Sequence, residues 1–423
     1  MVAPPDDRLA ADAWRLLATR GLRGFADGVV SVLLSGYLLA LGLGPVSVGA
    51  IATATMLGSA ALTIGVGLGG LRLPRSTLFG LACALMAVTG AGFASLRQLW
   101  PLLVIAVVGT LNPSSGDVSV FLPLEQAALA DATAARSRAW VFALYNVVGS
   151  GAAALGALAG GAPEVLARTA GVPFLSSARA AFILYALTGL VVSALYRRLA
   201  ATGPAAPRTA PPSLEARPEG RSTASPWFGG LGSSRGTVLK LSALFSLDSF
   251  GGGFVVQSLL VLWLGQRFGL SGAQAGVLFF AVGLLGAASQ LVSGRIAARV
   301  GYIRTMVFTH LPANAFLIAA GLSTDVRVAV AMLLARAALS SMDVPARQAY
   351  VMAVVSPEER AAASSLTNVP RSLAAAVPPL FTGALLAASS FGWPLVIGGT
   401  LKAIYDVLLL AQFRHVRPAE TGA

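Results

Sequence analysis

Long apolar runs separated by short polar turns recur along the whole 423-residue chain. A helix needs about 20 mostly apolar residues to cross the hydrocarbon core of a bilayer. We expect twelve membrane-spanning helices, of which the fourth is the least regular because the polar sequence NPSSGD interrupts it at 112–117. In chain order they cover residues 24–43, 46–68, 76–95, 100–122, 139–161, 178–196, 238–264, 275–296, 303–322, 328–344, 364–387 and 392–413.

One long polar segment divides these spans into two groups of six. Residues 197–236 are rich in proline, glycine, serine and arginine, and they carry too few apolar side chains to build a core. Such a composition is typical of a flexible linker. We therefore expect an N-terminal six-helix bundle at 1–196, a linker at 197–236 and a C-terminal six-helix bundle at 237–423.

The composition places the chain in a bilayer. Hydrophobic residues make up 56% of it and charged residues only 11%, whereas about a quarter of the residues in a soluble domain are charged. We therefore expect an all-α integral membrane protein. Most of the 30 basic residues lie in the termini, the linker and the loops on one side. By the positive-inside rule both termini face the cytoplasm, and the net charge of +13 indicates topology rather than a nucleic-acid partner.

Motifs of soluble enzymes are missing from the sequence. The single cysteine, Cys83, excludes a disulfide framework and a cysteine-based metal site. There is no phosphate-binding loop, no histidine and glutamate metal cluster and no nucleophile elbow. We expect no enzymatic activity and no cofactor. Lysine is rare among the basic residues, which is typical of a GC-rich bacterial genome, so we expect the bacterial cytoplasmic (inner) membrane.

Two stretches of the chain repeat one another. The sequence PLEQAALADATAARSRAWVFALYNV at 123–147 aligns without a gap with PARQAYVMAVVSPEERAAASSLTNV at 345–369. The proline, glutamine, arginine and asparagine positions coincide, and Asn146 answers Asn368. A glycine and an arginine after the second span, Gly67 and Arg72, are likewise answered by Gly294 and Arg299 after the eighth. Each six-helix half therefore reads as a copy of the other, as in transporters with parallel repeats.

The loop that follows the eighth span carries a family motif. The sequence GRIAARVGYIR at 294–304 resembles the pattern G-x-x-x-D-R-x-G-R-R/K of the major facilitator superfamily. The matching residues are Gly294, Arg299, Gly301 and Arg304, while Ala298 stands where the family has an aspartate. Twelve spans in two pseudo-symmetric sixes, with a long central loop, are similar to this superfamily throughout the chain.

The resemblance implies a secondary active transporter that works by alternating access. Glycines in the fifth span resemble those of exporters and favour proton-coupled efflux of a small organic molecule, whereas the spacing of Gly156 and Gly160 more simply permits close helix packing. Two alternatives stay open: an uptake permease for a small anionic metabolite, and a non-transporting sensor or scaffold that kept the fold. The expected partners are a small-molecule substrate, protons and the lipid bilayer, and the expected state is a monomer.

Ionisable side chains inside predicted spans are candidates for binding substrate or protons. Asp27 and Asp248 lie in the first helix of each half, which lines the central cavity in this superfamily. The alternative for Asp27 is an ion pair with Arg23, one turn earlier. Asp248 has no charged neighbour within a turn of its own helix.

The tenth span adds a second group of candidates. Arg336 and Asp343 are seven residues apart and share one helical face. An arginine in mid-membrane needs a counter-charge, which either a substrate anion or a structural acid supplies. Asp117, in the weak fourth span, belongs to the same class of candidate.

Further polar residues are expected to make gating or inter-helix contacts. Arg371 can neutralise either Asp343 or Glu125, while Lys402 and Asp406 are spaced to pair with each other. His310 is interpreted as a structural histidine. The residues expected in gating or inter-helix contacts are Glu125, Asn146, Arg299, Arg347, Asn368 and Arg371.

Overall fold

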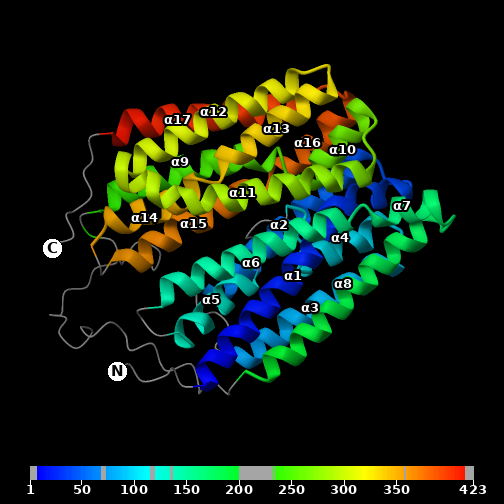
Figure 1. Ribbon diagram of the computed structural model, residues 1–423, viewed down its shortest axis with the longest axis horizontal. Coiled ribbons are helices and arrows are strands. Elements are labelled where there is room, and N and C mark those ends of the chain that lie inside the picture. The colour runs from blue at the N-terminus through cyan, green and yellow to red at the C-terminus, as the bar shows by residue number, and fades with distance from the viewer. Residues whose placement is uncertain are drawn as a thin grey trace.

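The computed structural model describes residues 7–67, 73–114, 120–133, 137–199, 232, 234–356 and 359–414. Within these ranges the regular elements are all helices (Figure 1), as the sequence predicts. We refer to 7–199 as the N-terminal half and to 234–414 as the C-terminal half. The helices run roughly along one direction, which suits a set of membrane-crossing segments.

The N-terminal half contains eight helices among its described residues. They are α1 (Asp7–Ala40), α2 (Pro45–Gly67), α3 (Arg75–Ser95), α4 (Leu99–Val108), α5 (Phe121–Asp131), α6 (Arg138–Ala159), α7 (Ala162–Thr169) and α8 (Phe174–Arg197). Five of these helices are long and match predicted spans, and α4, α5 and α7 are short.

The C-terminal half contains nine helices among its described residues. They are α9 (Arg235–Gly253), α10 (Gln257–Phe268), α11 (Gly272–Val300), α12 (Tyr302–Leu322), α13 (Val326–Ser340), α14 (Asp343–Ala353), α15 (Arg360–Ala376), α16 (Pro378–Ala388) and α17 (Trp393–Phe413). Several adjoining pairs, such as α9 with α10, form one apolar stretch long enough to cross a bilayer.

The expected fourth span is shorter in the structure than the sequence predicts. Eleven apolar segments of the described chain are long enough to cross a membrane, and α4 is a shorter apolar helix. The helix stops at Gly109, and the side chain of Asn112 then accepts hydrogen bonds from the backbone N–H and the hydroxyl of Ser114. Such asparagine turns compete with helical hydrogen bonding, and Pro113 removes a donor.

Three predicted spans of the C-terminal half are interrupted. The breaks fall at Phe254–Val256, at Ser341–Met342 and at Val377. The last precedes Pro378 and Pro379, which cannot donate the backbone hydrogen bonds of a continuing helix. Broken helices are tolerated at membrane depth where protein surrounds them.

Within each half, a close contact at a glycine fixes how two helices pack against one another. A Cβ added to Gly28 of α1 would lie 2.1 Å from the carbonyl oxygen of Ala153 in α6, and one added to Gly253 of α9 would lie 2.4 Å from that of Ala375 in α15. The gapless alignment of the two repeats continues to 161 and 383, and it places Ala375 opposite Ala153. The α1–α6 and α9–α15 pairs are therefore packed in the same way, and Gly28 corresponds to Gly253.

The two halves meet at the end of the molecule away from the described ends of the chain (Figure 1). There Gly49 of α2 packs against Gly383 of α16, and a Cβ on Gly161 would lie 2.5 Å from Ala273 at the start of α11. The carboxylate of Glu164 in α7 accepts a hydrogen bond from the backbone N–H of Ala273 at 3.1 Å. Near the other end, the corresponding residues Asn146 and Asn368 are exposed.

Candidate functional site

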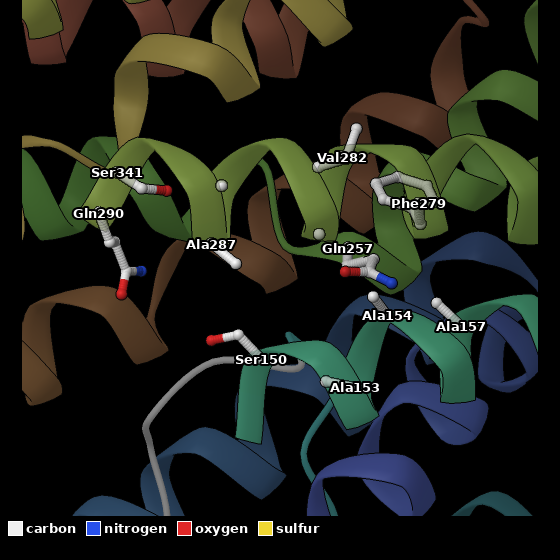
Figure 2. Close-up of a pocket in the computed structure, with 12 residues that line it drawn as sticks. Ser150, Ala153, Ala154, Ala157, Gln257, Phe279, Val282, Ala287, Gln290 and Ser341 are labelled. Carbon is white, nitrogen blue, oxygen red and sulfur yellow. The ribbon is translucent and has the colours of Figure 1, made fainter. Parts of the chain in front are cut away.

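A cavity of about 180 Å³ lies between the halves, and we call it the seam cavity. Its N-terminal wall is α6, and α10 and α11 supply most of the other wall (Figure 2). Much of the lining is alanine and glycine, whose small side chains let a bound molecule come close to the backbone and to the polar side chains. Its polar side chains are Ser150, Gln257, Gln290 and Ser341.

The seam cavity ends where the helices touch. A Cβ on Gly283 of α11 would lie 2.8 Å from the Cβ of Ala154 in α6, and Gly276 makes a similar contact with the backbone of Ala157. Across α1 and α10, the amide of Gln257 donates a hydrogen bond to the hydroxyl of Ser31 at 2.8 Å. The cavity is thus bounded by contacts that join one half to the other.

A buried ion pair lies inside the N-terminal half. Glu125 of α5 is fully buried and accepts hydrogen bonds from Arg23 of α1 and from the hydroxyls of Tyr145 and Tyr196. Thr19 donates a fourth at 2.9 Å. These donors satisfy both carboxylate oxygens, so Glu125 holds α1, α5, α6 and α8 together.

Asp27 lies one turn beyond this ion pair and is differently placed. Its side chain is buried, and no hydrogen bond or salt bridge joins it to another described residue. Arg23 forms its salt bridge with Glu125 and acts on Asp27 only through its charge, without a direct hydrogen bond among the described residues. A buried carboxylate without a donor is costly in its charged form, and it is suited to take up a proton.

Asp248 is the centre of a second buried cluster, inside the C-terminal half. Its Oδ1 accepts a hydrogen bond from the Nζ of Lys402 in α17 at 2.6 Å, and its Oδ2 lies 3.4 Å from Nη1 of Arg347 in α14. Arg347 also bonds Asp343 at 3.2 Å. The cations that neutralise Asp248 come from other helices, which the sequence around it does not reveal.

The expected salt bridge between Lys402 and Asp406 is wrong. Lys402 binds Asp248. Asp406 instead lies 3.0 Å from Nδ1 of His310 and accepts a hydrogen bond from the amide of Asn314 at 2.8 Å. His310 and Asn314 are one turn apart on α12, so both reach the same carboxylate. The sequence gives no sign of this contact, because α12 and α17 are far apart along the chain.

The ion pairs of the two buried clusters occupy matching positions in the two halves, but the acid and the base have changed places. Five residues before the matched glycines Gly28 and Gly253 stand Arg23 and Asp248. Their partners Glu125 and Arg347 hold one position of the sequence repeat. The first helix of each half is therefore tied to the helix after the fourth span by an ion pair of opposite polarity.

Arg336 and Arg371 are the remaining cations near the second cluster. Arg371 donates from Nε to the hydroxyl of Ser249 at 2.8 Å, whereas Asp343 and Glu125, its expected partners, bind Arg347 and Arg23. No described residue forms a hydrogen bond with Arg336, whose Nε is buried. The carboxylates that attract it are Asp248 and Asp343.

The other predicted site residues lie at the ends of helices or outside the described chain. Asn146, Asn368 and Arg299 are exposed, and the amide of Asn368 bonds Ser364 one turn earlier at 3.3 Å. Asp117 and Arg72 lie outside the described residues. Sequence reasoning missed Ser150, Gln290 and Ser341, which have no signal beyond being polar residues in apolar helices.

One family model matches most of the chain. The model described as Major Facilitator Superfamily matches residues 16–326 and 241–423. An uncharacterized membrane protein of Saccharomyces cerevisiae is 27% identical over 353 residues, which is 79% of each chain.

Solved structures share the fold at low identity. A bacterial homolog of the human lysosomal transporter Spinster, in an inward-facing and occupied conformation, has a TM-score of 0.73 at 16% identity and covers 99% of this chain and 100% of its own. The nucleoside transporter NupG has a TM-score of 0.69 at 12% identity and covers 96% and 99%.

Proposed function

We propose, since this chain belongs to the major facilitator superfamily, that it carries a small polar organic solute across a membrane by alternating access. The chain is a multi-pass membrane transporter and not an enzyme. The observation that carries the proposal is the seam cavity, which lies between two halves that touch at one end. A solute held there can be exposed to either side when the halves rock about it.

The lining of the seam cavity favours a small solute that forms hydrogen bonds. Two amides and two hydroxyls offer both donors and acceptors, and none of the described residues that line the space is charged. The alanine and glycine walls leave room for an apolar portion of the solute. A pocket with a few polar groups in a mostly apolar lining is typical of small-molecule sites.

The orientation follows from the basic residues of the sequence. With both termini in the cytoplasm, the end where Asn146 and Asn368 are exposed faces inward and the closed end faces outward. The two six-helix bundles at 1–196 and 237–423, joined by the linker at 197–236, would then be the rocking units, in a bacterial inner membrane.

Proton coupling is assigned to Asp27. The ion pairs of Asp248 with Lys402 and Arg347 leave it little freedom to bind a proton alone. Asp27 is buried and has no such partner among the described residues. In the efflux direction, a proton that enters from outside would bind Asp27 as the solute leaves.

A second candidate function is transport of an anionic metabolite. The observation that favours it is Arg336, a cation in the membrane-spanning region that forms no hydrogen bond with a described residue. A guanidinium binds a carboxylate or phosphate through two parallel hydrogen bonds, which a lysine cannot reproduce. Arg336→Lys would therefore weaken binding of an anionic solute and leave binding of a neutral one unchanged.

The proposed site is tested by a substitution that fills the seam cavity with a large side chain. A thermal-shift panel of small neutral and anionic metabolites first identifies a stabilising solute. Ala287→Trp places an indole in the cavity and is expected to abolish that stabilisation. The matched control is Leu284→Trp on the same helix, where the side chain is exposed, and this variant should bind the solute normally. Equal stabilisation of Ala287→Trp and the parent would overturn the proposed site.

A further inference from the structure

His310 lies between two carboxylates that belong to different helices. Its Nδ1 is 3.0 Å from Oδ1 of Asp406 in α17, and its Nε2 is 3.8 Å from Oδ1 of Asp248 in α9. The ring is buried in the C-terminal half, away from the residues that line the seam cavity. The imidazole thus connects the first helix of this half to the last.

Both nitrogens of the ring lie near carboxylate oxygens, and Nδ1 also lies 3.2 Å from the amide nitrogen of Asn314, which donates a hydrogen bond to Oδ2 of Asp406. A neutral imidazole has one N–H donor and one lone pair, whereas the protonated ring donates from both nitrogens. With a single N–H on Nδ1, the lone pair of Nε2 would point toward the Asp248 carboxylate and be repelled by it. A proton on Nε2 turns this repulsion into attraction.

The two carboxylates beside His310 differ in how many cations bind them. Asp248 already holds Lys402 on Oδ1 and Arg347 on Oδ2. Asp406 is fully buried, and its other hydrogen-bond donor is the neutral amide of Asn314. Among the described residues, His310 is therefore the one hydrogen-bonded group that can supply a positive charge to Asp406.

The other titratable groups near His310 belong to the helices that surround it. Tyr405 of α17 presents its ring edge-on to His310, with centroids 6.1 Å apart. Asp343 in α14 is bound by Arg347. Arg336 in α13 and Arg371 in α15 act electrostatically on Asp248 and Asp343. These two cations act on Asp248 and Asp343, whereas Lys402, which binds Asp248, also attracts Asp406 without a hydrogen bond to it.

We propose that His310 is a second proton-binding site of the transporter, which binds its proton while Asp248 and Asp406 both face the ring. The step is reversible dissociation of the Nε2–H proton to water, after which the neutral ring keeps its Nδ1–H on Asp406. Movement of α9 relative to α12 and α17 would separate Asp248 from the ring and release the proton. This inference rests on the proposed transport function, in which Asp27 holds the first proton.

The protonation state can be measured without altering His310. The sequence has two histidines, so the variant His415→Gln leaves His310 as the single histidine, once its transport is shown to equal the parent's. Solid-state NMR of the ¹⁵N-histidine-labelled protein in liposomes then reports both ring nitrogens. Across samples from about pH 5 to about pH 8, we expect a doubly protonated ring that loses its Nε2 proton and becomes the Nδ1–H tautomer.

A ring that stays in one neutral tautomer throughout this range, or that stays doubly protonated throughout, would overturn the inference. The first result would make His310 a structural link between α12 and α17. The second would make it a permanent cation for Asp406. The NMR result reports the protonation state of His310 whether or not the proposed transport function is correct.

Proton stoichiometry tests the role in transport. In proteoliposomes that contain a pH-sensitive dye, His310→Gln is expected to move one proton fewer per solute than the parent. Solute binding, measured by thermal shift, shows whether the variant is folded. A parent that moves no protons would contradict the proposed function. A parent that moves protons, with unchanged stoichiometry in a folded His310→Gln variant, would contradict this inference alone.

Discussion

Single side chains divide the buried charges of this protein into satisfied and unsatisfied groups. Glu125 receives four donors, and Asp248 receives two cations from other helices. Among the described residues, Asp27 accepts no hydrogen bond and Arg336 donates none. Because an unpaired charge in the membrane is costly, such residues are retained for function more readily than for stability. The functional candidates are therefore those that the fold leaves unpaired.

Asp27→Asn tests the proton-binding role. The amide cannot bind a proton, so we expect at least one proton fewer to move per solute than in the parent, while exchange of labelled for unlabelled solute continues. A pH-sensitive dye and a radiolabel in the same proteoliposomes measure the two activities. The control is Asp131→Asn, an exposed carboxylate paired with Arg75. Undiminished proton movement in Asp27→Asn would show that another group carries the proton.

The ion pair of Arg23 with Glu125 allows a double-mutant cycle. Glu125→Leu or Arg23→Leu alone leaves a buried charge uncompensated, so each is expected to lower the free energy of unfolding by about 3–5 kcal/mol. The double variant removes both charges and is expected to lose less than the sum. Denaturant unfolding in detergent measures all three.

The exposed pair of Arg75 with Asp131 is the control for this cycle, and disrupting it is expected to cost less than about 1 kcal/mol. Strictly additive losses in the buried cycle would mean that Arg23 and Glu125 do not stabilise one another.

Sequence reasoning finds charged candidates more easily than it finds their partners. Asp248 and Arg336 stand out because they are charged residues in apolar stretches. The partners Lys402 and Arg347 could not be assigned, because helix-to-helix contacts depend on register and tilt. The helical spacing of Lys402 and Asp406 even favoured a pair that the fold replaces with two inter-helix contacts. His310 gained significance only when α12 was placed beside α17.

Helices of this protein approach one another through small residues. In α6, Gly156 lies so close to α1 that an added Cβ would be 2.0 Å from the carbonyl oxygen of Phe25. Close packing of backbones is a main source of helix association in lipid. The spacing of Gly156 and Gly160 indicated such a contact from the sequence, but it did not indicate which helix would make it.

Gly156→Leu tests this helix contact. The side chain cannot fit against the α1 backbone, so α1 and α6 must separate, and overpacking of this kind ordinarily costs about 1–3 kcal/mol. Gly151→Leu on the same helix is the matched control, because a Cβ at Gly151 meets no atom within 4 Å. Thermal unfolding in detergent is expected to show a lower midpoint for Gly156→Leu only. Equal midpoints for the two variants would contradict the close packing.

Breaks in helices were harder to predict than the helices themselves. Long apolar runs identify membrane-spanning segments well, since the bilayer demands them. Periodicity does not report a break such as that between α9 and α10, because the two helices together read as one apolar stretch. The prolines at 378 and 379 are the exception, and they do mark the start of α16.

Across the whole molecule, the two halves touch at one end and enclose the seam cavity between their middles. The internal repeat accounts for the matched packing of α1 with α6 and of α9 with α15. The cavity itself lies between residues of opposite halves, so no local pattern in the sequence could predict its lining. The central claim is that these halves rock about the seam cavity during transport.

A reversible cross-link across the closed end tests this claim most directly. The backbone N–H of Leu380 in α16 donates to the hydroxyl of Thr53 in α2 at 3.0 Å, so these positions adjoin across the halves. The variant combines Thr53→Cys and Leu380→Cys with Cys83→Ala, which removes the native thiol. After oxidation we expect solute transport in proteoliposomes to fall to background while solute binding persists, and a reductant should restore transport. Undiminished transport by the fully cross-linked protein would contradict alternating access about this seam.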